Sequence, residues 1–194
     1  MSGSPDRKVA FLGGGRMGEA LVSGLIRSGG RSAGEIMVTS RREDRSRELG
    51  ETYGIDSTLS NADAVAWADV LVLTVKPQDM DVLLSQIREH VTQEQLVVSF
   101  AAGIRTSFVE KHLPDGVHVV RVMSNVAVLV DEAMSVVAAG SNAEDRHLEV
   151  AEELLGYVGA GCFQVQQGRG ERVKAGPHQR TAVQPDRRRR GVAC

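Results

Sequence analysis

Short apolar runs alternate with amphipathic stretches over about the first 165 residues of the chain. The strongest run, Val70–Val75, has the length and the β-branched content of a strand that is buried on both faces. Between such runs, apolar residues recur at helical spacing, as Met17, Leu21 and Leu25 do. The chain therefore predicts strands and helices in alternation.

This alternation predicts an α/β fold of the Rossmann type, with a doubly wound and mostly parallel sheet. The expected strands are Val9–Leu12, Ile36–Thr39, Ile55–Leu59, Val70–Val75, Leu96–Phe100, Val117–Val122, Met134–Ala139 and Cys162–Val165. The expected helices are Met17–Arg27, Ser40–Tyr53, Ser60–Trp67, Gln78–Val91, Thr106–His112 and Ala143–Leu155. Ser40 and Glu43 have the spacing of a capping box, and Ser60 is placed to cap the helix that it begins.

The pattern stops after Val165, which divides the chain into a domain over residues 1–165 and a tail over residues 166–194. The tail has no apolar periodicity, and four consecutive arginines occupy Arg187–Arg190. Such a segment buries too little apolar surface to offset its ordering entropy. We therefore expect an irregular, disordered basic tail.

Charge and cysteine content narrow the class of protein. Eight basic and two acidic residues follow Gln164, in a chain whose net charge is −2, so the rest of the chain is acidic. An acidic body argues against a nucleic-acid-binding domain. The two cysteines make no disulfide framework, the five histidines form no ligand-like cluster, and the apolar runs are too short to span a membrane. We expect a cytoplasmic protein that binds a small molecule.

A glycine-rich turn carries the clearest chemistry. Gly13, Gly15 and Gly18 fit Gly-x-Gly-x-x-Gly between an expected strand and an expected helix, with Arg16 and Met17 inside the motif. In that context the first glycine permits a tight turn, the second lets backbone approach a pyrophosphate, and the third allows close helix packing. The amide groups at the helix start then stabilise the anion. A structural turn without a ligand is the alternative.

The end of the second strand bears on the choice between NAD and NADP. A carboxylate there would bind a ribose 2′-hydroxyl, but the sequence has Ser40, Arg41 and Arg42 instead. Arginine suits a 2′-phosphate through charge-assisted hydrogen bonds, which favours NADP(H) over NAD(H). The alternative is that Ser40 only caps a helix and that both arginines are solvated.

Two further residues lie where a cofactor would pass over the sheet. Lys76 follows the central strand, between Val75 and Pro77, and Asn125 follows the strand expected at Val117–Val122. Ligands of such sheets bind beyond the carboxyl ends of the strands. Each residue is either a cofactor contact or an ordinary exposed loop residue.

Four ordered motifs together resemble the amino-terminal domain of pyrroline-5-carboxylate reductases. They are FLGGGRMG at 11–18, VKPQ at 75–78, SFAAGI at 99–104 and VRVMSN at 120–125. The resemblance covers about Val9 to Val165 and implies reduction of 1-pyrroline-5-carboxylate to L-proline by hydride transfer from NADPH or NADH. It implies cofactor contacts from Gly13, Gly15, Arg16, Met17, Gly18, Ser40, Arg41, Val75, Lys76, Pro77, Ala101, Ala102, Gly103 and Asn125. It names no catalytic residue and no metal.

The sequence also departs from that family. Ser124 and Val126 flank Asn125 where the family usually has proline and threonine, which removes a hydroxyl near the expected nicotinamide. The family's helical domain, which binds substrate and joins subunits into homo-oligomers, has no counterpart after Gln166. We hypothesise that the tail derives from out-of-frame or degraded coding sequence and that the chain alone is inactive. A non-catalytic NADP-binding module and a deazaflavin-dependent NADP oxidoreductase are the alternatives.

Overall fold

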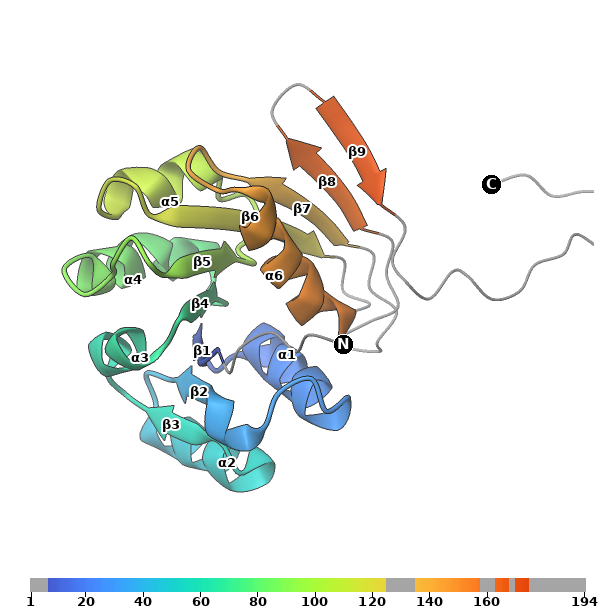
Figure 1. Ribbon diagram of the computed structural model, residues 1–194. Helices are drawn as coiled ribbons and strands as arrows, with labels where there is room; N and C mark the ends of the chain where they lie inside the picture. The colour runs from blue at the N-terminus through green and yellow to red at the C-terminus, as the bar shows by residue number, and fades with distance from the viewer. Residues whose placement is uncertain (1–6, 125–134, 158–162, 168–169, 175–194) are drawn as a thin grey trace, which may run out of the picture.

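A computed structural model describes residues 7–124, 135–157, 163–167 and 170–174 of the chain. Nine strands of these residues form one sheet in the order β3-β2-β1-β4-β5-β6-β7-β8-β9 (Figure 1). The strands are β1 Val9–Leu12, β2 Ile36–Thr39, β3 Asp56–Thr58, β4 Val70–Leu73, β5 Leu96–Ser99, β6 His118–Ser124, β7 Ser135–Ala139, β8 Phe163–Gln167 and β9 Gly170–Lys174. The first six strands are parallel, whereas β7 runs antiparallel to β6. The predicted doubly wound, mostly parallel sheet is confirmed.

Helices cover both faces of this sheet. They are α1 Arg16–Arg27, α2 Glu43–Tyr53, α3 Asn61–Trp67, α4 Met80–Ile87, α5 Thr106–His112 and α6 Asp145–Gly156, with short 3-10 turns η1 Ala33–Glu35 and η2 Pro77–Asp79. Apolar residues of α1, α2 and α6 pack on one face, and those of α3, α4 and α5 pack on the other (Figure 1). Successive residues of β1 point to opposite faces, so that Phe11 joins the first core and Leu12 the second. Burial on both faces explains why these strands are apolar throughout.

The parallel register brings the ends of the central strands to one level. Leu12 at the end of β1 is paired with Thr39 at the end of β2 and with Leu73 at the end of β4. Leu73 is paired in turn with Ser99 at the end of β5. The loops that follow these four strands therefore share one edge of the sheet, which is the place where ligands bind in folds of this type.

The start of α2 differs from its prediction. The capping box predicted from Ser40 is wrong, because α2 begins at Glu43 with Arg42 as its N-cap and without a side-chain cap. Ser40 instead stays with the sheet, since its backbone N–H donates to the Thr58 carbonyl at 3.2 Å. Its hydroxyl accepts the Arg42 N–H at 3.3 Å, which forms a local turn ahead of the helix. By contrast, Ser60 caps α3 as predicted and accepts the Asp63 N–H at 3.1 Å.

The expected helix after β4 is also shorter and begins differently. The turn η2 precedes α4, and Pro77 is the first residue of η2. Proline has no N–H to donate and a fixed φ, so it suits the first position of a helical turn. The chain therefore turns sharply after Lys76 before α4 begins.

The carboxy-terminal part of the sheet differs from the irregular tail that the sequence predicted. Gln166 and Gln167 belong to β8, and Gly170–Lys174 forms β9, antiparallel to β8. Strand pairing uses backbone groups that every residue carries, so it needs no apolar periodicity at an edge. Residues 175–194, which include the four arginines, lie outside the described residues.

Candidate cofactor site

Most of the candidate residues predicted from the sequence lie at the carboxyl edge of four neighbouring strands. The glycine turn follows β1, Ser40 and Arg41 follow β2, the Val75–Pro77 segment starts one residue beyond Thr74, after β4, and the Ala101–Gly103 segment follows β5 (Figure 1). Because these strands are adjacent and parallel, the structure gathers all four loops along one rim. Asn125 lies outside the described residues, and its cofactor contact stays a prediction.

The turn at Gly13 is shaped by its backbone conformation. Gly13 has φ +123°, which L-residues with a side chain rarely adopt, and a Cβ there would lie 3.0 Å from the Val75 nitrogen. The Thr74 hydroxyl lies 2.8 Å from the Gly13 carbonyl oxygen and 3.3 Å from that of Leu12, and donates to this pair. Thr74 thus ties the glycine turn to the end of β4. Sequence reasoning treated Thr74 only as part of a strand.

Gly15 differs from the other glycines of the turn because it faces open space. Apart from Gly15 itself and its two chain neighbours, no described residue has an atom within 4 Å of the position that a Cβ on Gly15 would take. Its backbone is ordinary, with φ −78° and ψ −171°, so no turn requires glycine at this position. Gly15 is the N-cap of α1 and offers no side-chain cap to the first amide groups of the helix. Those amide groups are available to an anion in the space that a side chain would fill.

Gly14 and Gly18 are packing positions. A Cβ on Gly14 would lie 2.7 Å from Leu49 Cδ1 of α2, and Leu49 is itself buried. A Cβ on Gly18 would fall well inside contact distance of the Gly13 carbonyl oxygen. These two glycines allow α2 and α1 to approach the turn closely, as predicted for Gly18.

An arginine that the sequence analysis did not identify holds the turn from the side. Arg45 Nε donates to the Gly14 carbonyl at 3.0 Å. The same guanidinium donates to Glu19 Oε2 of α1 at 2.5 Å and to Glu48 Oε2 of α2 at 2.8 Å. Hydrogen bonds to Glu48 and Glu19 raise the pKa of Arg45 above its usual range. Arg45 therefore joins the glycine turn to both neighbouring helices.

Tyr53 extends this network at the end of α2. Its hydroxyl donates to Glu19 Oε1 at 3.2 Å, so both oxygens of Glu19 accept a hydrogen bond from α2. Burial, and then the charge of Glu19, raises the pKa of the Tyr53 hydroxyl. Glu19 thus lies between the Arg45 guanidinium and the Tyr53 hydroxyl, and these contacts fix α1 against α2.

The loop after β2 carries two arginines with different partners. Arg41 reaches across to η2, where its Nη1 and Nη2 each lie 3.3 Å from one oxygen of Asp79. Arg42 pairs with Asp44 two residues along the chain, and this hydrogen bond lowers the pKa of Asp44 to about 2. Arg41 thus spans two loops of the rim, whereas Arg42 is engaged locally.

The loops after β4 and β5 complete the described rim. Lys76 is exposed and caps the turn η2. Ala101 is buried, and its N–H lies 3.4 Å from the hydroxyl of Ser99, which is also buried. Gly103 has φ +77°, a left-handed conformation that glycine adopts without strain. The backbone of the loop after β5 therefore lies at the rim, without a large side chain between them.

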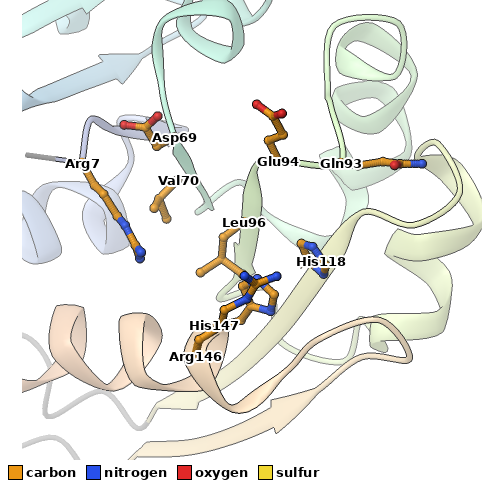
Figure 2. A pocket seen from close by; sticks show the side chains of 9 residues that line it. All are labelled: Arg7, Asp69, Val70, Gln93, Glu94, Leu96, His118, Arg146 and His147. Atoms are coloured by element: carbon orange, nitrogen blue, oxygen red, sulfur yellow. The ribbon is translucent and has the colours of Figure 1, made fainter. Parts of the chain in front are cut away.

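A separate pocket lies at the opposite end of the strands. It has a volume of about 590 Å³ and is lined by residues that include Val70, Leu96 and His118, from the beginnings of β4, β5 and β6 (Figure 2). The rings of His118 and His147 stack at its side, with their centroids 3.9 Å apart. The glycine turn is at the other edge of the sheet, so this pocket is not the candidate cofactor site.

Two observations on the described segments bear on other functions. Within them, no group of three or more His, Cys, Asp or Glu side chains is arranged to hold a metal ion. No helix that the structure describes is long and apolar enough to cross a membrane.

Comparison with known proteins identifies the domain. Residues 8–103 match the family described as NADP oxidoreductase coenzyme F420-dependent. The pyrroline-5-carboxylate reductase of Methanosarcina acetivorans is 39% identical over 154 residues, which are 79% of this chain and 57% of that protein. The protein of the same name from Corynebacterium melassecola is 41% identical over 154 residues, with 78% of this chain and 57% of that protein covered. The chain therefore spans little more than half the length of these relatives.

Solved structures agree with this result. A pyrroline-5-carboxylate reductase from Coxiella burnetii superposes with a TM-score of 0.76 and 29% identity, over 81% of this chain and 58% of that one. A Plasmodium falciparum pyrroline carboxylate reductase with NADP bound has the same fold, with a TM-score of 0.70 and 20% identity over 85% of this chain and 58% of that one. Over 79% of its length the chain is therefore similar to a pyrroline-5-carboxylate reductase, of which it spans 57%.

Proposed function

We propose that the domain binds NADP(H), and NAD(H) more weakly, along the rim at the carboxyl ends of β2, β1, β4 and β5. The pyrophosphate lies against Gly15 and the first amide groups of α1. The observation that carries this proposal is the open space at Gly15, because no turn or packing contact requires glycine there. Binding of a dinucleotide phosphate explains why glycine occupies that position.

The adenosine half then lies beside the loop after β2. Ser40 and Arg41 offer a hydroxyl and an exposed guanidinium at the end of a strand that carries no carboxylate there. A guanidinium binds a 2′-phosphate through paired hydrogen bonds, whereas a 2′-hydroxyl would favour a carboxylate. This arrangement supports a preference for NADPH.

The nicotinamide half then lies over the loops after β4 and β5. Lys76 and Ala102 are exposed in these loops, and a Cβ on Gly103 would meet open space. Val75, Pro77 and Ala101 contact the cofactor through their backbone or ring atoms, and Asn125, which lies outside the described residues, is also expected to contact it. These roles follow from the family resemblance and from the placement of the described residues along one rim.

Calorimetric titration of the purified chain with NADPH and with NADH tests this cofactor assignment. We expect saturable binding of both nucleotides at one site, with the tighter binding for NADPH. Absence of binding, or equal affinity for the two nucleotides, contradicts the assignment of Arg41 to the 2′-phosphate.

For the reaction, we infer that the domain serves a pyrroline-5-carboxylate reductase. Bound NADPH would supply a hydride to the imine carbon of 1-pyrroline-5-carboxylate, and the ring nitrogen would take one proton from water, which gives L-proline and NADP⁺. The described residues bind and orient the nucleotide for this step. The inference rests on relatives of that name at 39% and 41% identity.

A second candidate is a nucleotide-binding module without catalysis. It is favoured by the described rim, whose glycine turn and open space at Gly15 account for nucleotide binding, while no described residue is assigned to the substrate. Oxidation of NADPH by the purified chain, with and without 1-pyrroline-5-carboxylate, distinguishes the two candidates. Substrate-dependent oxidation supports the reductase, and nucleotide binding without oxidation supports the module.

A third candidate follows from the family model over residues 8–103, whose description names a coenzyme F420-dependent NADP oxidoreductase. In this candidate function, the hydride acceptor is an oxidised deazaflavin instead of the cyclic imine. The same assay with oxidised F420 in place of 1-pyrroline-5-carboxylate tests it. Bleaching of the deazaflavin absorbance by NADPH supports the third candidate, and its absence beside an active imine reaction rejects it.

A further inference from the structure

The pair formed by Arg41 and Asp79 crosses the rim where the adenosine of the cofactor is proposed to lie. Arg41 belongs to the loop after β2, and Asp79 ends the turn η2 after β4. The strand that carries the glycine turn, β1, lies between β2 and β4 in the sheet. The pair therefore connects two loops on either side of the strand that leads to the phosphate site.

The geometry of the pair engages both arms of the guanidinium. Nη1 faces Oδ1 and Nη2 faces Oδ2, each at 3.3 Å, so the two planar groups meet side by side. The Arg41 side chain is 83% exposed and that of Asp79 is 30% exposed. The same paired arms would bind the oxygens of a phosphate. A carboxylate thus occupies the donors that a 2′-phosphate would need.

Among the described contacts, the Asp79 carboxylate pairs only with Arg41. Asp79 is the N-cap residue of α4, yet its side chain accepts no capping hydrogen bond. The neighbouring cation, Arg42, pairs with Asp44 within its own segment and therefore does not compete with Arg41 for Asp79. The Asp79 carboxylate therefore interacts with the rim mainly through Arg41.

We propose that Asp79 is a specificity-determining residue that weakens the preference for NADPH over NADH by competing for Arg41. This inference rests on the proposed binding of NADP(H). NADPH must displace the Asp79 carboxylate from Arg41 and then carry its phosphate beside that negative charge. NADH has a 2′-hydroxyl and meets neither cost. The wild-type chain is accordingly expected to accept both nucleotides with a modest preference.

The test compares the affinities of NADPH and NADH for the full chain and its Asp79→Asn variant by calorimetry. We expect NADPH to bind about two- to fivefold more tightly to the variant, the range set by an exposed ion pair, while NADH binding stays unchanged. Asp79→Ser provides a second variant without a charge. Thermal melting confirms that each variant is folded.

Asp81→Asn is the matched control, because Asp81 lies two residues further on and pairs with His112 at 3.0 Å, away from Arg41. It removes the same charge and should leave the NADPH to NADH ratio unchanged. In an Arg41→Ala background, Asp79→Asn should change the ratio less, because the competition for Arg41 is gone and only the repulsion between the phosphate and the carboxylate is left.

Three outcomes overturn the proposal: an unchanged ratio in both Asp79 variants, an equal change in the Asp81 control, or a full effect in the absence of Arg41. Lack of NADPH binding by the unmodified chain overturns the cofactor assignment itself and this inference with it. Normal binding with an unchanged ratio overturns only the role of Asp79.

Discussion

Arg45 Nε donates a hydrogen bond to the carbonyl oxygen of Gly14 at 3.0 Å. The carbonyl and the N–H of a trans peptide point in opposite directions. The bond from Arg45 therefore fixes the plane of the Gly14–Gly15 peptide and turns the Gly15 N–H away from Arg45. The orientation of that amide group, which the proposed pyrophosphate site uses, is set by a residue of the next helix.

Replacing Arg45 with Met should weaken nucleotide binding more than it weakens the fold. The change keeps an apolar chain of similar length and removes the hydrogen bonds to Gly14, Glu19 and Glu48. We expect affinity for NADPH to fall about three- to tenfold, since a partly exposed charged hydrogen bond contributes about 1 kcal/mol. Such a loss lowers the melting temperature by only about 2–4 °C. Calorimetry and thermal melting measure the two effects.

Arg47→Met is the control for Arg45, because Arg47 lies on the same helix and pairs only with Glu43 among the described contacts. It should leave NADPH affinity unchanged. If both variants weaken binding equally, the effect is one of net charge, and the specific role of Arg45 is wrong.

Gly15→Ala should impair nucleotide binding, whereas Gly18→Ala should impair the stability of the fold. Among the described residues, nothing lies near a Cβ on Gly15, whereas a Cβ on Gly18 would meet the Gly13 carbonyl oxygen. Gly15→Ala should keep the melting temperature within about 2 °C and lower NADPH affinity at least about tenfold, because the methyl group fills the phosphate space. Gly18→Ala should destabilise the fold by about 1–3 kcal/mol through overpacking. Urea unfolding and calorimetry separate the two effects.

Gly34→Ala is the control for both measurements. A Cβ on Gly34 also meets nothing among the described atoms, and Gly34 lies before β2, away from the rim. It should change neither stability nor affinity appreciably. Unimpaired NADPH binding by a folded Gly15→Ala variant would refute the proposed position of the pyrophosphate.

Arg41→Ala should convert a preference for NADPH into equal binding of the two nucleotides. Of the two nucleotides, only NADPH has a 2′-phosphate that can accept the paired charge-assisted hydrogen bonds of this side chain. We expect NADPH affinity to fall about tenfold and NADH affinity to change less than about twofold. Competitive displacement of NADPH by 2′-phosphate-containing fragments measures the same loss independently. A parallel fall in NADH affinity would assign Arg41 to the adenine or the pyrophosphate instead.

His147 should make the fold sensitive to acid. Its side chain is only 9% exposed, and burial, together with the nearby charges of His118 and Arg146, lowers its pKa from 6.5 to about 4. Its Nδ1 accepts the Glu144 N–H at 2.9 Å, a bond that protonation of Nδ1 removes. The unfolded chain therefore takes up a proton at a higher pH than the folded chain does. Stability should fall as pH decreases from about 6.5 to about 4, by up to about 1 kcal/mol per pH unit.

Urea unfolding at several pH values between 7 and 4 measures this dependence. The His147→Gln variant should show a flatter profile over that window, even if its stability at pH 7 is lower. His90→Gln is the control, because His90 is exposed and should leave the slope unchanged. Identical slopes for the wild type and the His147 variant would show that other groups cause the acid sensitivity.

The parts of this molecule that could be predicted from the sequence are those that depend on local order. A buried strand that ends in glycines and leads into a helix predicts the glycine turn within ten residues, Val9–Gly18. The contacts of Arg45 with Glu19 and of Arg41 with Asp79 join residues 26 and 38 positions apart on different elements. No periodicity within one segment indicates such pairs, because they depend on how two elements pack.

The error at Ser40 has the same origin. A hydroxyl three residues before a glutamate has the spacing of a helix cap, but a backbone bond to Thr58 keeps Ser40 beside the neighbouring strand. Tertiary pairing therefore overrode a local signal. The strand Gly170–Lys174 escaped prediction for a related reason, since its pairing with β8 relies on backbone groups rather than on side-chain pattern.

The hydroxyl of Thr74 closes the glycine turn from a position 61 residues further along the chain. During synthesis the turn leaves the ribosome 61 residues ahead of Thr74, so its geometry is incomplete until β4 has formed beside it. Domains generally fold as units as synthesis proceeds, and long-range strand pairing is a slow step of folding. We therefore expect fragments that end before β4 to bind no cofactor. Cofactor binding should appear only when the domain folds as a unit.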